Sequence, residues 1–361
     1  MSRRQRSRRA RSQRLPQALL RKRRRRHASV RAPAPVKTVP DDSVSEPVAS
    51  PLGFSVRGWW QALLRVRRSM LEDHLLLVAA AVAFYGFLAI FPALFAFVTL
   101  YGLVADPGQV EPQLRPLRDF IPVEAYSILA DQLEKITSTT DTKLSVGLLF
   151  GFLAALWSET NGSKALMTAM NIAYSEQEAR GFVRQNIVAA LFTVGAIFMA
   201  IFSLAALAFV PGMVSIMDAG PLFEAGLMWL RWVILTCIVM LTLGLLYRYG
   251  PNRREARFQW ITPGAVLATG LWMLGSVGFS FYAANFGSYN ETFGSLGAVV
   301  VLLIWFYLTS SVICLGARLN AELELQTSRD STIGPVQPKG SRGAYVADNV
   351  ASAPAAGASG R

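Results

Sequence analysis

The chain has 361 residues, of which 52% are hydrophobic and 16% charged, and its mean hydropathy is +0.35. Soluble domains carry about a quarter charged residues, so this composition argues against a soluble enzyme. The net charge of +13 is confined to one end: residues 1–40 hold 15 lysines and arginines and no acid, whereas the other residues hold 21 cations and 23 acids. The apolar residues form long blocks without a polar side, which indicates a membrane protein.

The two ends of the chain differ in composition from the middle. Residues 1–57 are predicted to form a disordered basic cytoplasmic tail, because they are rich in arginine and then in proline and lack an apolar helical face. No apolar segment follows the first arginines within the length of a signal peptide, so neither an export signal nor a twin-arginine signal is expected. Residues 326–361 are rich in Gly, Ala, Ser and Pro and are predicted to be a second disordered cytoplasmic tail.

An amphipathic helix is predicted at 58–73, ahead of the first apolar block. Its apolar side chains fall near one helical face and its arginines on the others, which suits the membrane surface. The apolar residues are Trp59, Leu63, Val66 and Met70, and the cations are Arg65, Arg67 and Arg68. A second surface helix is predicted at 122–136.

Six apolar segments follow, and each can supply the roughly 20 residues that cross the hydrocarbon layer. They are residues 75–104, 144–160, 184–210, 227–248, 260–284 and 295–318. The first contains Pro92, which is expected to kink it, and the second is the weakest, because its apolar run extends only from Leu144 to Trp157. The predicted fold class is therefore an all-α polytopic integral membrane protein with six transmembrane helices and amphipathic surface helices, in a membrane domain of residues 58–325.

The distribution of cations predicts the orientation of these segments. Lysine and arginine concentrate in cytoplasmic loops. Residues 105–143 hold four cations and seven acids, and residues 211–226 and 285–294 hold no cation, so these connections are predicted to lie outside. The connections predicted to lie inside contain Lys164, Arg180, Arg184, Arg248, Arg253, Arg254 and Arg257. Both termini are then cytoplasmic.

Two polar clusters are candidates for a substrate path, since polar groups near membrane depth are costly unless they face a cavity or each other. The first follows segment two and includes Trp157, Glu159, Asn161, Lys164 and Asn171; the second lies between segments five and six and includes Tyr289, Asn290 and Thr292. Each also has a structural interpretation, the first as a helix end beyond the hydrocarbon and the second as a tight hairpin.

Other residues are assigned to packing or to the membrane surface. Gly264 and Ala268, four residues apart, together with Pro92, are expected at close helix contacts. Arg318 is expected to extend its side chain to the interface, with an ion pair in the bundle as the alternative. The cations predicted to meet anionic lipid headgroups at the inner leaflet are Arg65, Arg67, Arg68, Arg253, Arg254 and Arg257.

Residues that could support catalysis are scarce. Cys237 and Cys314 lie in apolar blocks, and the two histidines, His27 and His74, lie outside the predicted bundle. Hydrolysis of phosphodiesters by zinc requires several His, Asp or Cys ligands. The sequence therefore predicts no enzyme, no metal site, no cofactor and no specific nucleic-acid partner.

Several stretches resemble the YihY/virulence factor BrkB family of bacterial inner-membrane proteins, long labelled ribonuclease BN-like. They are AAAVAFYGFLAIFP, WSETNGSKALMTAMNIAY, RYGPNRR with the following PGA, YAANFGSYNETFGSLGAV and WFYLTSSVICLGARLNAELE, within residues 58–325. Arg318 departs from the family pattern, where similar proteins more often read LGAELNAE. The resemblance implies a six-helix inner-membrane protein with a transport-related function, and the scarcity of histidines argues against the nuclease label.

Two hypotheses for function follow. The first is a transporter or flippase-like protein of the inner membrane for an amphiphilic or lipid-like molecule; the chain has no GxxxxGK[ST] nucleotide-binding motif, so transport would need a gradient or a partner. The second is a non-transporting membrane scaffold for envelope assembly, with an envelope protein as its partner.

The predicted topology can be tested with a reporter that is active only in the cytoplasm. It should be active when fused at Gly250 or after Gln326 and inactive at Ala219 or Ser288, because the cation-rich connections face inward. Reporter activity at Ser288 would contradict the six-span arrangement.

Overall fold

The computed structural model describes residues 47–104, 160–216, 220–285 and 295–351. The chain divides into two units, Met1–Ser43 and Val44–Arg361, and all of the described residues belong to the second. Within them the secondary structure is helical, apart from an isolated antiparallel bridge between Ala256 and Thr332. The predicted all-α class is confirmed.

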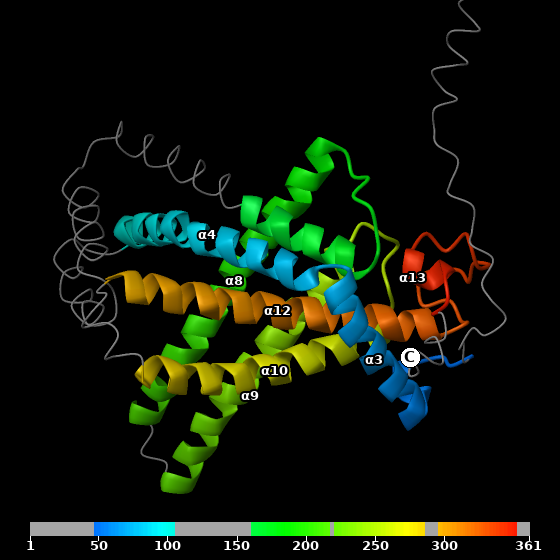
Figure 1. Cartoon of the computed structure of the whole chain (residues 1–361). Coiled ribbons are helices and arrows are strands. Elements are labelled where there is room, and N and C mark those ends of the chain that lie inside the picture. The colour runs from blue at the N-terminus through cyan, green and yellow to red at the C-terminus, as the bar shows by residue number, and fades with distance from the viewer. Residues whose placement is uncertain (1–46, 105–159, 217–219, 286–294, 352–361) are drawn as a thin grey trace, which may run out of the picture. The chain divides into compact units, whose positions relative to one another are not determined.

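The elements run in the following order (Figure 1). They are the short helix η1 (Pro51–Gly53), α3 (Val56–Glu72), α4 (Leu75–Val104), a helix at residues 160–173, α8 (Phe182–Ile216), α9 (Pro221–Tyr249), α10 (Phe258–Asn285), α12 (Ser295–Gln326) and α13 (Tyr345–Asp348).

Four of the described helices contain segments long and apolar enough to cross a membrane. These segments are Phe182–Ser203, Ala225–Tyr249, Phe258–Tyr282 and Val299–Gln326. The helices α3 and α4 meet at a bend of 66° and form a fifth candidate if they are counted as one span. The structure thus supports a membrane protein but does not confirm the count of six. The surface helix predicted at 122–136 and nearly all of the span predicted at 144–160 lie outside the described residues.

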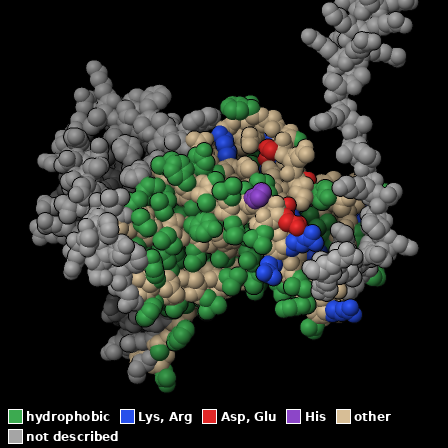
Figure 2. Space-filling view, in the orientation of Figure 1, with side chains coloured by type: hydrophobic (Ala, Val, Ile, Leu, Met, Phe, Trp, Pro, Cys, Tyr) green, Lys and Arg blue, Asp and Glu red, His purple; other side chains and the backbone are tan. Residues whose placement is uncertain are grey.

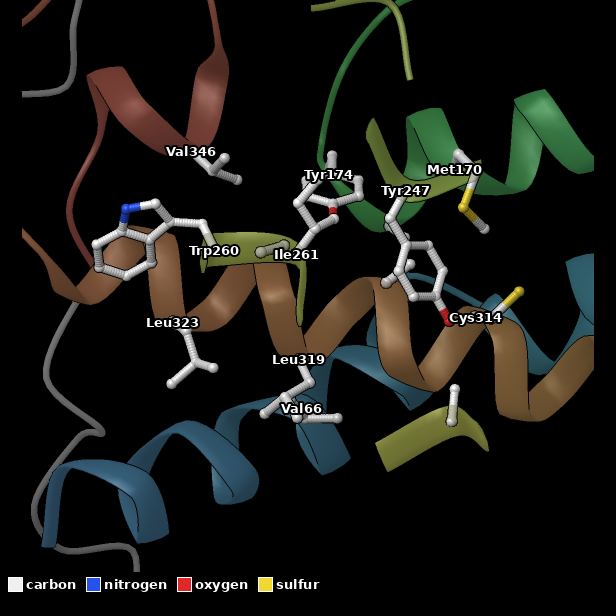
Figure 3. Close-up of a cluster of buried hydrophobic side chains, with 14 of the residues drawn as sticks. Val66, Met170, Tyr174, Tyr247, Trp260, Ile261, Cys314, Leu319, Leu323 and Val346 are labelled. Carbon is white, nitrogen blue, oxygen red and sulfur yellow. The ribbon is translucent and has the colours of Figure 1, made fainter. Parts of the chain in front are cut away.

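Helix α12 is the central element of the bundle. It packs against α3, α4 and α10, and α9 packs between α10 and α8 (Figure 1). The buried core lies at the end of α12 that contains Leu319 and Leu323, where Val66 of α3, Trp260 of α10 and Val346 of α13 converge (Figure 3). Farther along the helices large apolar side chains are exposed, and Figure 2 shows them over a broad face, as expected where lipid is the solvent.

Helix α3 is amphipathic, as predicted, but its buried face differs from the predicted one. The Ser55 side chain caps its start by accepting a hydrogen bond from the Gly58 amide at 3.1 Å. Residues Gly58, Ala62, Val66 and Met70 are buried at four-residue spacing, whereas Leu63 is exposed.

Buried charges join α3 to α12. The carboxylate of Glu322 accepts hydrogen bonds from Arg65 Nε at 2.8 Å and Ser69 Oγ at 3.2 Å, and it forms an ion pair with Arg318 Nη2 at 2.9 Å. Arg318 Nη1 lies 3.4 Å from an Asp73 carboxylate oxygen. The Glu322 side chain is only 3% exposed. These contacts hold α3 against α12, because separating the two helices would leave the buried charge of Glu322 without the partners that α3 provides.

A second buried pair lies on the opposite face of α12. Arg253 Nη2 is 2.9 Å from both carboxylate oxygens of Glu324, and the two side chains are 1% and 0% exposed. The guanidinium of Arg253 stacks over the Tyr174 ring, and Ser331 Oγ donates to Glu324 at 2.8 Å. We call these two sets of contacts the ionic layer; its charged residues are Arg65, Asp73, Arg253, Arg318, Glu322 and Glu324.

The ionic layer corrects three expectations. Arg65 and Arg253 are not surface cations, because α12 presents an acid to each of them. Arg318 does not extend to an interface: it is buried and forms ion pairs, and it also donates to the carbonyl of Ala173 at 2.9 Å.

The structure also corrects the expectation of disorder after residue 326, since residues 327–351 fold against the end of the bundle. Arg342 organises this C-terminal segment through hydrogen bonds to backbone carbonyls, and Asp330 accepts hydrogen bonds from Thr332 and Gln337. The carbonyls that Arg342 binds are those of Ser328, Arg329, Gln337 and Ala347. The segment is rich in Gly, Ala, Ser and Pro, and this composition did not indicate that Arg342 and Asp330 would provide hydrogen-bond partners for the backbone groups of its turns.

Helices α10 and α12 approach most closely at glycines. A Cβ atom on Gly264 would collide with the Gly316 carbonyl oxygen, and one on Gly316 would lie 2.8 Å from the Ala268 Cβ. Asn320 also binds the α10 backbone next to Pro263, accepting from the Gly264 amide at 2.7 Å and donating to the Ile261 carbonyl at 3.0 Å. It thereby supplies partners where proline interrupts the helical hydrogen bonds.

We expect Gly264→Ala to destabilise the bundle, by about 1–3 kcal/mol for overpacking, because the added methyl group has no space. The matched control is Gly270→Ala on the same helix, where a Cβ meets nothing within 4 Å. Unfolding in mixed detergent micelles measures both variants. Equal stability of the two would contradict this close contact.

We expect Glu322→Ala to lower the free energy of unfolding by about 3–5 kcal/mol, since it leaves the buried Arg65 and Arg318 without their shared acid. The control is Glu72→Ala, which breaks the exposed pair between Arg68 and Glu72 and should have little effect. The same micelle titration measures both. Similar losses in the two variants would show that the ionic layer does not stabilise the bundle.

Candidate functional site

A cavity of about 480 Å³ lies between α8, α9, the helix at 160–173 and the connection after α9. At one end it is lined by cations, and we call it the arginine cavity. Its charged lining residues are Arg180, Arg184, Arg248, Arg253 and Glu255. Arg184 is exposed on the first turn of α8, so the cationic end reaches the protein surface.

The walls of the arginine cavity are apolar away from the cations. They consist of side chains from three helices: Leu166, Val188, Leu191, Phe192, Ala196, Met199, Leu245 and Leu246. A second cavity of about 240 Å³ shares Met199 and Thr242 with the first and continues among α8, α9, α10 and α12. Together they combine a charged mouth with an apolar interior.

The two cavities extend far along the membrane-crossing helices. On α8 they span from Arg184 to Ser203, nineteen residues apart, which at 1.5 Å per residue is about 28 Å. On α9 they span from Tyr249 back to Ile238, or about 16 Å. The two cavities together therefore lie beside most of the apolar segment Phe182–Ser203 of α8.

Arg180 fixes the geometry of the mouth. Its Nη2 atom donates to the carbonyls of Gly250 and Pro251 at 3.0 and 2.6 Å, and its Nε lies 3.8 Å from a carboxylate oxygen of Glu178. The side chain is 6% exposed. Burial lowers the pKa of Arg180, the neighbouring charge of Arg184 lowers it further, and Glu178 acts in the opposite direction.

The other cations of the mouth differ in how they are compensated. Arg248 pairs with Glu255 at 3.1 Å and stacks over the Phe258 ring. Arg253 is paired with Glu324; burial opposes its charge, but Glu324, together with Tyr174 and Glu176, outweighs burial and raises the pKa of Arg253. Arg184 has neither a hydrogen bond nor an ion pair among the described residues, so it contributes an uncompensated positive charge.

A polar clamp holds the two loops of the mouth together. The amide nitrogen of Asn171 donates to Glu178 at 2.9 Å, and its oxygen accepts from the Asn252 backbone at 2.6 Å. Asn252 Nδ2 in turn donates to the carbonyl of Gln177 at 3.0 Å. Asn171, predicted to lie on a substrate path, is therefore buried and positions the arginine-bearing loops.

Two other residues predicted for the substrate path do not line the arginine cavity. Asn161 and Lys164 line a different cavity of about 610 Å³, between the helix at 160–173 and α4, together with Tyr85. The remaining members of the two clusters lie outside the described residues: Trp157, Glu159, Tyr289, Asn290 and Thr292.

The remaining predicted surface cations and packing residues have the following positions. Arg67 and Arg68 are exposed, Arg254 donates to the Pro335 carbonyl and Arg257 to that of Thr332. Pro92 lies within α4. Arg254 and Arg257, which lie in the connection after α9, thus attach the C-terminal segment to the bundle.

Sequence reasoning used Arg180, Arg184 and Arg248 only for orientation and did not identify them as a site. A signal was present, because both cation-rich connections were predicted on the same side of the membrane and could therefore meet. Ser163 and Thr193, whose hydroxyls lie 2.8 Å apart, join the helix at 160–173 to α8 and gave no sequence signal. Among the described residues no group of three or more His, Cys, Asp or Glu side chains could hold a metal ion.

The sequence of this chain is similar to those of known membrane proteins. Residues 66–340 match the virulence factor BrkB family. The ribonuclease-like protein YfkH of Bacillus subtilis is 32% identical over 250 residues, covering 68% of this chain and 88% of YfkH. A UPF0761 membrane protein of Chlorobium luteolum is 28% identical over 250 residues, covering 69% of this chain and 56% of that protein.

A third relative is a UPF0761 membrane protein of Pseudoalteromonas translucida, 25% identical over 286 residues, which cover 76% of this chain and 88% of that protein. No solved structure matches the chain. The family match extends from α3 through the bundle into the C-terminal segment, and it agrees with the apolar helices described above. The chain therefore belongs to the virulence factor BrkB family of membrane proteins.

Proposed function

We propose that this protein is a transporter or flippase-like protein of the bacterial inner membrane that handles an amphiphilic, lipid-like molecule. The observation that carries the proposal is the arginine cavity with its inner continuation, a charged mouth joined to an apolar interior along α8 and α9. Such a space matches a molecule with a polar head and an apolar chain.

The proposed orientation places the arginine mouth and both termini on the cytoplasmic side. The cation-rich connections and the C-terminal segment meet at the same end of the bundle, where Arg180 binds carbonyls after α9 and the Tyr345 amide donates to Glu176 at 2.6 Å. Positive charge favours the cytoplasmic side, and anionic lipids of the inner leaflet are attracted to it.

The proposal can be tested with purified protein in liposomes that contain fluorescent phospholipid, with quenching from outside as the measure of movement between leaflets. Wild-type protein should accelerate the movement, and Ala196→Trp should abolish it, because the indole would fill the arginine cavity. Val194→Trp is the matched control, since Val194 is an exposed residue of α8 that does not line this cavity.

No movement of lipid by the inserted wild-type protein would contradict the proposal and favour the non-transporting envelope scaffold. Equal loss in the two tryptophan variants would show that the cavity is not the route. Circular dichroism and melting in detergent establish that each variant is folded.

A further inference from the structure

The mouth of the arginine cavity has more guanidinium hydrogens than partners. Among the described residues, Arg180 Nη1 and Arg253 Nε and Nη1 are buried without a hydrogen-bond partner, and both side chains are more than nine-tenths buried. An unpaired buried donor on a charged group is costly. Both residues line the cavity, so an acceptor bound there could satisfy them.

The acids near the mouth are already engaged. Glu255 binds Arg248, and Glu324 binds Arg253 and Ser331. Glu178 lies 3.8 Å from Arg180 Nε and accepts hydrogen bonds from Asn171 and from the Arg180 backbone amide. Arg184 has no such partner among the described residues, and its charge is close enough to lower the pKa of Arg180. An anion between Arg180 and Arg184 would relieve this repulsion, whereas Glu255, the acid among the lining residues, is paired with Arg248.

Resting on the proposed function, we infer that the molecule held in the arginine cavity is an anionic phospholipid, with its phosphate bound by Arg180 and Arg184. A phosphate group offers several acceptor oxygens to guanidinium groups that converge from different directions, and arginine binds it in a bidentate manner. The acyl chain lies along Leu191, Met199 and Leu245. A choline headgroup is disfavoured, because its cation would meet the same arginines.

Arg184 is the residue on which to test this inference. Arg180 also binds the carbonyls at the end of α9, so its loss would disturb the loop itself, whereas Arg184 is exposed and makes no such contact. The matched control is Arg57→Gln, which removes one exposed arginine from α3, outside the cavity lining.

Native mass spectrometry of the full chain in detergent, titrated with phosphatidylglycerol, phosphatidylcholine or inorganic phosphate, measures the dissociation constants. Wild-type protein should bind phosphatidylglycerol at least about tenfold more tightly than phosphatidylcholine, because both lipids offer a phosphate but only choline brings a cation close to the arginines. Arg184→Gln should remove most of this preference, Arg57→Gln should keep it, and Ala196→Trp should abolish the binding of both lipids.

The alternative outcomes separate this inference from the proposed function. Equal affinity for the two lipids, with both lost in Ala196→Trp, would overturn the headgroup assignment and leave the cavity as a lipid site. Inorganic phosphate bound as tightly as phosphatidylglycerol, and still bound by Ala196→Trp, would identify a free-phosphate site and overturn the assignment to a lipid. Lipid binding that Ala196→Trp leaves unchanged would contradict both proposals.

Discussion

The structure depends on charges buried on two faces of α12. Glu322 binds Arg65 and Arg318 toward α3, and Glu324 binds Arg253 on the other side. Since 322 and 324 differ by about 200° around a helix, the two acids fasten different neighbours to one central element. Each pair is strong only while complete, because removal of one partner leaves a buried charge alone.

This constraint also positions the candidate site. Arg253 follows α9 directly, so its pairing with Glu324 fixes the connection whose carbonyls receive Arg180. The Asn171 clamp attaches the loop before α8 to the same connection. The cations at the base of the mouth are therefore held by ion pairs and hydrogen bonds, whereas Arg184 at its rim is exposed. Such preorganisation reduces the entropy lost when a ligand binds.

One end of the bundle is held by polar contacts and the apolar helices are held by close packing, as suits a protein that contacts both water and lipid. Interactions at the end with α3, α13 and the C-terminal segment are ionic and hydrogen-bonded, whereas contact between α10 and α12 depends on Gly264 and Gly316. In lipid, burial of apolar surface gives no driving force between helices, so close backbone approach and specific polar contacts take its place. The apolar cavities among α8, α9, α10 and α12 are the exception to this close packing.

The sequence alone determined the all-α class and the four membrane-crossing segments that the structure describes, because about 20 consecutive apolar residues have few other stable environments. It also indicated a small-residue contact at Gly264. Only the tertiary structure decided which charges are buried: Arg65, Arg253 and Arg318 look like interfacial cations until Glu322, Glu324 and Asp73 are placed beside them. The fold of residues 327–351 likewise depends on contacts between segments far apart in the chain, and so does the cavity that Arg180 and Arg184 line together with Arg248 and Arg253, because no local pattern encodes such contacts.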